Sequence, residues 1–297
     1  VNGTELTKGW VEGVDETSGN SHAIGSSTTP ATSKDDADWY VENADNTDSK
    51  FSIHINWLKS DGAFKFDNNG KPNVIKITYE GVLKSKGVVY GDNGNLNTAT
   101  LFVLPNGSTT RAQVGNPSET KAVTYSGELF KYTTENGVKK PLAGAEFTIT
   151  RAGETAPLAF YPSKAYAGVY YLANDENWNS EHVDNSDPSK KESMKVTTLV
   201  TPADGMIITR GLAGGEYTIT ETKAPDGYNK LTASIKMPLE QGGNPTAGVN
   251  VTDVNKTLAA DGSPLSTPVA FQNVHVKEIE NNKGTVLPET GGIGTTL

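Results

Sequence analysis

Three polar side chains lie on strand faces that are otherwise apolar, and together their chemical types allow a covalent reaction. Alternation of side chains in three predicted strands places Lys131, Glu221 and Asn273 toward the core. Burial disfavours charge, so it lowers the pKa of an amine and raises the pKa of a carboxyl group. A neutral Lys131 amine is a nucleophile, and a protonated Glu221 can polarise the Asn273 amide carbonyl and shuttle protons. The predicted product is a Lys131–Asn273 isopeptide bond, with ammonia leaving.

The same pattern allows two simpler arrangements. Lys131 and Glu221 could form a buried ion pair that Asn273 completes with hydrogen bonds. Alternatively, a shift of one residue in strand register would turn all three side chains to the outside, because successive side chains point to opposite faces. Alternation alone does not decide between these arrangements and the isopeptide bond.

The first part of the chain, residues 1–118, has the pattern of an incomplete β-sandwich. Residues 1–50 are polar and irregular, and we expect a long surface excursion there. Period-2 alternation then appears in FSIHINWL, NVIKITYEGVL and TATLFVL, with turn signals at 67–73 and 91–95. Residues 105–120 are expected to form a loop.

A second β-sandwich is predicted over residues 119–276. Nearly every segment is a short strand followed by a turn rich in Gly, Pro or Asn, and a loop-rich insertion occupies 156–194. The helical period is weak except around 165–178. Residues 277–285 are predicted to be a polar linker, and the chain ends on a tail containing VLPETGG.

Composition excludes several classes of protein. The net charge of -9 argues against nucleic acid as a partner, because binding a phosphate backbone requires a basic surface. The chain has no cysteine, which excludes disulfides, thiolate metal sites and cysteine nucleophiles. No run reaches the ~18 apolar residues of a membrane-spanning helix. Because the first residue is Val1 and no signal peptide is visible, we expect a chain cut at both ends.

We predict no cofactor, no metal and no external substrate. The chain has no G-x-S-x-G, no H-E-x-x-H and no phosphate-binding loop, and its four histidines are scattered. Acidic residues cluster between 35 and 48, which leaves Ca²⁺ binding as a weak alternative. Their spacing does not match the D-x-[DN]-x-[DN]-G pattern of a calcium loop.

Several stretches resemble the sortase-assembled pilin subunits of Gram-positive bacteria, of the major or shaft type. FKYTTENGVKKPLAGAEFTI, GEYTITETKAPDGY and FQNV look like a CnaB-type immunoglobulin-like domain, and ETKAPDGY at 221–228 matches the E-box of these pilins. LPETG at 287–291 matches the sortase sorting motif, LPXTG. ITYEGVLKSKGVVYGDNGNLNTATLFV resembles the second half of a CnaA-like domain. The fold class implied is all-β, with tandem immunoglobulin-like sandwiches.

The resemblance assigns roles to the residues already singled out. It implies that Lys131 and Asn273 are the isopeptide partners and that Glu221 is the catalytic acid. It also implies that a sortase cleaves between Thr290 and Gly291 and joins the Thr290 carbonyl to an amine of the next pilin or of the peptidoglycan precursor. The protein would then be secreted and anchored to the cell wall on the bacterial surface. The implied recognition residues are Leu287, Pro288, Glu289, Thr290 and Gly291.

Two further features follow from the comparison with this family. Asn97, in LNTATL, stands where the isopeptide Asn of the first domain is expected, although no Lys or acidic partner for it can be assigned. The Tyr-Pro-Lys motif of shaft subunits is missing; FYPSK at 160–164 has an extra Ser and falls in the insertion, so we interpret it as a loop.

The main alternative function is a wall-anchored adhesin or ancillary pilin that binds a host ligand. The ligand would contact either the insertion over 156–194 or the loop over 15–50. The insertion holds several aromatic residues that could form an exposed binding patch. They could equally form the insertion's own small core, which we favour. These residues are Tyr161, Tyr166, Tyr170, Tyr171 and Trp178.

Overall fold

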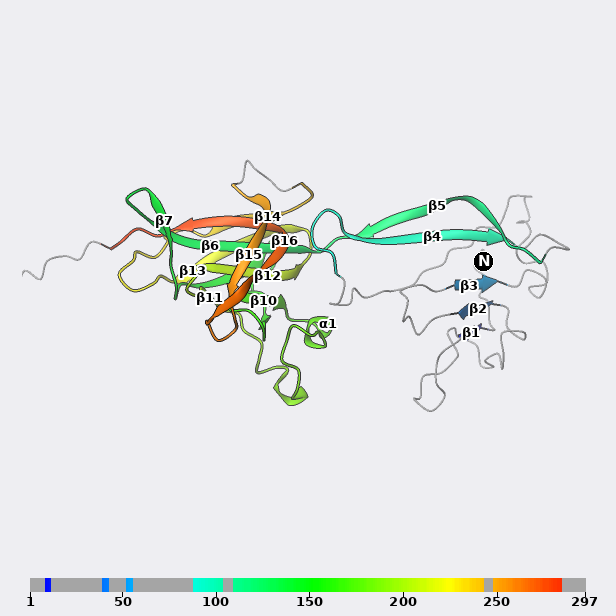
Figure 1. The fold of residues 1–297 in the computed structure, drawn as a ribbon, viewed down its shortest axis with the longest axis horizontal. Coiled ribbons are helices and arrows are strands. Elements are labelled where there is room, and N and C mark those ends of the chain that lie inside the picture. The colour runs from blue at the N-terminus through cyan, green and yellow to red at the C-terminus, as the bar shows by residue number, and fades with distance from the viewer. Residues whose placement is uncertain are drawn as a thin grey trace, which may run out of the picture. The chain divides into compact units, whose positions relative to one another are not determined.

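The computed structural model describes residues 9–11, 39–42, 52–55, 88–103, 109–242 and 248–284. The chain divides into two units, Val1–Gly81 and Val82–Leu297. This boundary lies well before the one predicted at 118/119. Nearly all the regular structure is β, which confirms the predicted all-β class (Figure 1). None of the helices among the described residues is long and apolar enough to cross a membrane.

The described part of the first unit is a small sheet of three strands. Strand β1 (Gly9–Val11) runs parallel to β2 (Trp39–Glu42), and β2 pairs antiparallel with β3 (Ser52–Ile55). Strand β3 falls in the predicted FSIHINWL strand. The predicted strand NVIKITYEGVL lies outside the described residues, as does most of the acidic cluster considered for Ca²⁺. Of that cluster only Glu42 is described, in the backbone of β2.

The second unit begins with a two-stranded antiparallel ribbon. Strand β4 (Asn95–Val103) pairs with β5 (Ala112–Ala122), and nearly every side chain of both strands is exposed. The prediction of a loop over 105–120 is therefore wrong for most of its length. The turn-forming residues Gly115, Asn116 and Pro117 suggested a loop. They fall between the paired residues Val114 and Ser118, and pairing with β4 on either side holds the segment in a strand. The register of the ribbon shifts between Ala99 and Leu101.

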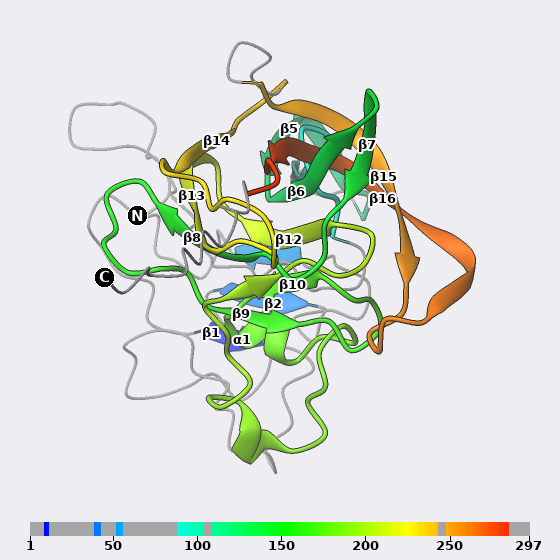
Figure 2. The same cartoon turned by 90° about the vertical axis from the view of Figure 1, so that its left-hand side faces the viewer.

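Two sheets form the sandwich that follows. One has the order β15-β16-β6-β12-β10-β9, with β7 added beside β6, and the other has the order β11-β8-β13-β14. In Figure 2 the strands β8, β13 and β14 lie to the left of β6 and β16. The bounds of the first sheet are β6 (Tyr125–Glu135), β7 (Val138–Pro141), β9 (Phe160–Pro162), β10 (Val169–Leu172), β12 (Met206–Leu212), β15 (Asn250–Leu258) and β16 (Pro264–Glu280). Those of the second are β8 (Glu146–Arg151), β11 (Leu199–Val200), β13 (Gly215–Lys223) and β14 (Ile235–Leu239).

The first and last strands of the sandwich are parallel neighbours. Strand β16 pairs with β6 from Val274↔Ser126 to Glu280↔Tyr132, and Figure 1 shows the two strands running side by side. Residues 277–280, predicted as part of a linker, therefore belong to a strand. The sequence pattern did not predict this strand, because residues 277–280 are charged except for Ile279. Ile279 is apolar and buried.

The main core fills the space between the two sheets. Its side chains come from alternate positions of β6, β8, β12, β13 and β14, as period-2 burial requires. The largest fully buried members include Tyr217, Phe147, Phe160, Leu129, Ile149, Leu199, Ile207 and Leu212.

A second apolar cluster lies on the other side of the larger sheet, where the insertion packs. It joins Tyr161 of β9 and Tyr171 of β10 to side chains of β12 and β16. The insertion has two short helical segments, α1 (Asp175–Trp178) and η2 (Pro188–Lys190), so the predicted helix around 165–178 is restricted to one turn. The buried members of this cluster are Tyr161, Val169, Tyr171, Trp178, Val183, Ile208, Phe271 and Val274.

Candidate functional site

Lys131 lies in the main core, near the end of β6. Its side chain is completely buried, although its neighbours along this face are apolar. The ring of Phe147, from the opposite sheet, lies 6.0 Å from Nζ. The strand pattern that buries Leu129 two residues earlier also directs Lys131 inward. An amine is thus held in a site that contains few polar groups.

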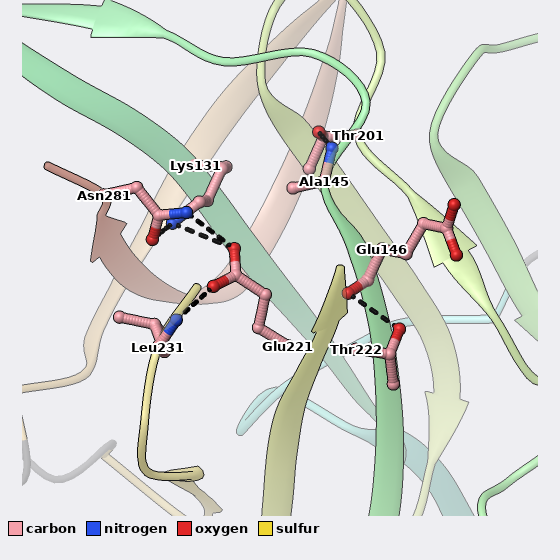
Figure 3. A network of polar contacts seen from close by, with 8 residues as sticks. All are labelled: Lys131, Ala145, Glu146, Thr201, Glu221, Thr222, Leu231 and Asn281. Carbon is pink, nitrogen blue, oxygen red and sulfur yellow. Dashed lines mark hydrogen bonds and ion pairs between the residues drawn. The ribbon is translucent and has the colours of Figure 1, made fainter. Parts of the chain in front are cut away.

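Glu221 approaches the same point from the second sheet. It lies on β13, opposite Phe147 of β8, and its side chain has no exposed surface. Its Oε1 is 3.4 Å from the Nζ of Lys131. Its Oε2 accepts a hydrogen bond of 2.7 Å from the backbone N–H of Leu231, which fixes the direction of the carboxyl group (Figure 3).

Asn281 completes the site from the residue that follows β16. Its side-chain Oδ1 accepts a hydrogen bond from the Nζ of Lys131, and its Nδ2 donates to Oε1 of Glu221 at 2.9 Å. Its backbone N–H donates to the carbonyl of Tyr132 at 2.9 Å, which extends the pairing of β16 with β6 by one residue. Figure 3 shows the three side chains converging, with the amine and the amide both directed toward the carboxyl group.

The electrostatics of the site favour a neutral amine. Burial lowers the pKa of Lys131, and the negative charge of Glu221 opposes this effect. A deprotonated amine has a lone pair that can attack a carbonyl carbon. The side-chain carbonyl group of Asn281 is in direct contact with the amine, because its oxygen accepts a hydrogen bond from Nζ. The arrangement therefore places a nucleophile, an amide and a proton carrier in direct contact.

Asn273 does not belong to this cluster. Its neighbour Val274 pairs with Ser126, five residues before Lys131, so Asn273 lies roughly 16 Å or more along the strand from the amine at ~3.3 Å per residue. Its backbone N–H donates to Oδ1 of Asp253 at 3.0 Å. The structure thus brings together Lys131 and Glu221 as predicted, but the amide beside them is that of Asn281.

A local distortion of the backbone explains why alternation pointed to Asn273. This residue has a φ of 52°, and the register between β15 and β16 shifts beside it, between Thr252 and Val254. Residues before the shift, such as Phe271, face the second apolar cluster, whereas Ile279 faces the main core. Alternation cannot be carried across such a bulge.

Locating Asn281 requires the pairing of β16 with β6. Lys131 is near the end of its strand, and in a parallel pair the residue beside it must lie equally far along the partner strand. Counting from Val274↔Ser126 at constant register leads to Ile279 beside Lys131 and to Asn281 two residues later. The parallel pairing of the first and last strands, which this count requires, cannot be derived from the period-2 pattern.

The other predicted site residues lie apart from this cluster or beyond the described residues. Asn97 is on the exposed β4–β5 ribbon, where its Nδ2 donates to Oγ1 of Thr120 at 3.4 Å. The sorting motif, Leu287 to Gly291, lies outside the described residues. Among the described residues, no group of three or more metal-ligating side chains is found.

The aromatic residues of the insertion are mostly buried. Tyr161 has no exposed surface, Tyr171 and Trp178 are buried, and the rings of Tyr161 and Trp178 are 5.3 Å apart. They do not form an exposed patch, and they do not form a core of the insertion alone, because the cluster that they join also contains Ile208, Phe271 and Val274. In FYPSK, the first three residues form β9 and only Lys164 at its end is exposed. The interpretation of FYPSK as a loop is therefore wrong for those three residues.

Comparison with protein families gives a match over part of the chain. Residues 129–255 match the family model of the SpaA prealbumin-like fold domain. The matched range includes Lys131 and Glu221 but ends before β16 and Asn281. No curated protein matches the chain.

Solved structures similar to this one come from Gram-positive pili. The group B streptococcus pilus 2b backbone protein is 23% identical, with a TM-score of 0.41, over 79% of this chain and 66% of that one. The shaft pilin SpaA from Lactobacillus rhamnosus GG is 20% identical, with a TM-score of 0.32, over 62% and 55%. The T6 backbone pilin of Streptococcus pyogenes serotype M6 is 15% identical, with a TM-score of 0.37, over 66% and 45%. The alignments thus span less than two thirds of the length of each of these proteins.

Proposed function

We propose that this protein is a structural subunit of a covalently assembled pilus, with a Lys131–Asn281 isopeptide bond inside its last domain. The observation that carries this proposal is the direct contact between Lys131, Glu221 and Asn281 in an otherwise apolar core. An ion pair placed there for stability alone would be a poor choice, because burying two charges costs about as much as their attraction returns. Contact between an amine, an amide and a carboxyl group is instead the arrangement that formation of an isopeptide bond requires.

The reaction forms one amide and breaks another. The neutral amine of Lys131 attacks the side-chain carbonyl carbon of Asn281, and Glu221 donates a proton to the carbonyl oxygen of the resulting tetrahedral intermediate. Glu221 then transfers the proton lost by Nζ to the departing NH₂ group and takes back the hydroxyl proton as the carbonyl reforms, so ammonia leaves and the carboxyl group returns to its starting state. The folded core holds the reactants in contact, which supplies the high effective concentration that an unactivated amide requires.

The tail supports the assembly part of the proposal. LPETG at 287–291 follows the last strand within a few residues, and the E-box precedes it in the order found in sortase-assembled pilins. A sortase would cleave after Thr290 and join it to an amine of a neighbouring subunit or of the peptidoglycan precursor. The domain, closed internally by its own bond, would then be one covalent link in a longer covalent chain on the bacterial surface. The protein is thus a sortase substrate, with no external substrate of its own.

The alternative of a monomeric adhesin loses its main sequence argument. It relied on the aromatic residues of the insertion as a patch for a host ligand, and most of these side chains are buried in the second apolar cluster. A structural role is consequently the better supported of the two.

Intact-mass spectrometry tests the internal bond. The wild-type chain should weigh less than its sequence by at least one ammonia, with a branched peptide joining Lys131 to Asn281 after digestion. Asn281→Ala and Glu221→Ala should lack this branched peptide and the loss of ammonia. Asn273→Gly is the matched control, because glycine keeps the positive φ while removing the amide; it should lose ammonia as the wild type does. A branched peptide at residue 273, or none at all, would refute the assignment.

Assembly needs its own experiment. Incubation of the full-length precursor with a pilus sortase should give a ladder of polymers that resist SDS, and Thr290→Ala should abolish it. Thr296→Ala, outside the motif, is the control. A protein that gives only a monomer attached to the wall would contradict the pilus role while leaving the internal bond untouched.

A further inference from the structure

A second buried lysine lies outside the site described above. Lys256, on β15, has no exposed surface, and it belongs to the side of the sheet that faces the second apolar cluster. Its Nζ donates to Oδ1 of Asp204 at 2.9 Å and to the carbonyl of Met206 at 2.9 Å. Asp204 lies in the turn that leads into β12, a strand that is not a neighbour of β15 in the sheet.

A second carboxyl group accompanies this pair. Glu128, on β6, is only 1% exposed and interacts electrostatically with both Lys256 and Asp204. Oε2 of Glu128 and Oδ2 of Asp204 are buried and have no hydrogen-bond partner within the described part of the chain. Unpartnered buried oxygens are costly, so two of them beside one buried amine require an explanation.

The insertion packs closely against the turn that carries Asp204, whose side chain keeps only a small exposed surface. Gly168 of the insertion packs against the turn, and a Cβ at this position would lie 2.4 Å from the carbonyl oxygen of Met206 and 2.8 Å from the Cδ of Pro202. Its φ of +72° is compatible with glycine and unfavourable for other residues. The insertion therefore closes over the turn that carries Asp204 and over the carbonyl that Lys256 contacts.

We propose that Lys256 and Asp204 form a second intramolecular isopeptide bond, with Glu128 as the proton carrier. The neutral amine of Lys256 attacks Cγ of the protonated Asp204 carboxyl group, a C–N bond forms, and a C–O bond breaks. Glu128 takes the proton from nitrogen and passes it to the departing hydroxyl group, which leaves as water. The product is neutral, so the charges of Lys256 and Asp204 disappear from a buried site.

Burial shifts the pKa values of Lys256 and Glu128 in the directions that this reaction uses. Burial lowers the pKa of Lys256, against the opposing effect of Asp204. Burial also raises the pKa of Glu128, to about 7, so this group exchanges protons near neutral pH. The cluster has the same three components as the first site: an amine, a side-chain carbonyl carbon and a proton carrier.

The second bond would hold a different part of the fold. Lys131 and Asn281 connect β6 to the end of β16, whereas Lys256 and Asp204 would connect β15, at the edge of the larger sheet, to the turn before β12. An edge strand is the part of a sheet most easily detached. This bond would attach the edge strand β15 to the turn before β12, over which the insertion packs.

Peptide mapping of the full-length wild-type protein tests the inference. We expect an additional loss of one water from the intact mass and a branched peptide that joins Lys256 to Asp204. Intact mass alone is insufficient, because Asp204 precedes Gly205 and could lose water by forming a succinimide. Tandem mass spectrometry separates the two results: a succinimide remains within the Asp204 peptide, and finding it without the branched peptide would overturn the proposal.

Two variants complete the test. Lys256→Arg keeps the positive charge but cannot form this bond, and Glu128→Gln keeps the shape but removes the proton carrier. Both should lose the Lys256–Asp204 peptide while retaining the Lys131–Asn281 peptide, which distinguishes this bond from the one in the proposed function. A wild-type protein in which Lys256 and Asp204 are recovered only in unlinked, unmodified peptides contains an ordinary buried ion pair, and the inference is then wrong.

Discussion

The side-chain amide of Asn281 contacts the amine of Lys131 although the two residues are 150 positions apart in the chain. One residue is near the end of the first strand of the sandwich and the other directly follows the last strand. A covalent bond between them would therefore enclose nearly the whole domain in one loop. It would also connect the two strands through which a pulling force enters and leaves the domain.

Asn281→Ala should lower the free energy of unfolding by roughly 5 kcal/mol, since the proposed bond would restrict the unfolded chain as a disulfide of this span does. Removal of a buried side chain that hydrogen-bonds both Lys131 and Glu221 adds to this loss. Thermal or denaturant unfolding measures the effect. Asn273→Gly should change stability by much less, and equal losses in the two variants would contradict a special role for Asn281.

The sequence was sufficient to predict the all-β class and the two components of the site that lie on regular strands. Lys131 and Glu221 each follow an unbroken alternation of buried side chains, so their orientation could be derived. Asn281 could not, because it follows a strand that contains a backbone distortion and whose last part is mostly charged. The position of an amide at such a strand end depends on pairing with a distant strand, which no local pattern contains.

The cluster of Lys256, Asp204 and Glu128 was missed for a related reason. Asp204 stands in a turn signal, PADG, where an acidic residue is ordinary. Lys256 lies in a strand whose other polar residues are mostly exposed. The three residues come from separate parts of the chain, so their grouping depends on tertiary packing that no local pattern contains.

Burial of Glu128 should make stability depend on pH. Its pKa is raised from 4.5 to about 7 in the folded protein, so the folded state holds a proton that the unfolded state releases over this interval. The contribution of Glu128 to the free energy of unfolding is fully present below about pH 4.5. It is lost as the pH rises toward 7, and the total loss is about 3 kcal/mol.

Denaturant unfolding between pH 4.5 and 8 measures this contribution. Glu128→Gln should remove the part of the slope of the free energy of unfolding against pH that Glu128 causes, whatever its effect on absolute stability. Exposed Glu278→Gln serves as the control and should leave the slope nearly as in the wild type. Parallel curves for the wild type and Glu128→Gln would show that Glu128 is not the group responsible.

Gly205→Ala should disturb the backbone that carries Lys131. Gly205 has a φ of +70°, and a Cβ there would lie 2.4 Å from the carbonyl oxygen of Lys131. Strain and overlap together should cost roughly 2–4 kcal/mol and reduce the fraction of molecules that form the Lys131–Asn281 peptide. Gly262→Ala is the matched control, because Gly262 has a φ of +83° but no atom within 4 Å of the added Cβ. Equal losses of stability in the two variants would mean that backbone strain alone, and not the contact with Lys131, determines the effect.

Arg210 should hold the segment around Tyr90 against the sandwich. Its guanidinium carbon lies 4.0 Å from the ring centroid of Tyr90 and 4.6 Å from that of Phe271, and burial lowers its pKa. Next to Tyr90, the backbone N–H of Gly91 donates to Thr124 at 2.8 Å. Arg210→Met keeps much of the volume but removes the cation, and each cation–π interaction that it abolishes is worth about 0.5–2 kcal/mol.

Hydrogen exchange of the Gly91 amide measures this attachment directly, because its hydrogen bond must open before exchange. In Arg210→Met the amide should exchange several-fold to tens of times faster, while amides in the centre of β13 keep their wild-type rates. Lys236→Met, which removes an exposed ion pair with Glu216, is the control and should leave Gly91 unaffected. If the Gly91 amide is equally protected in Arg210→Met and in the wild type, the hydrogen bond to Thr124 and the neighbouring backbone hold this segment without the stacked cation.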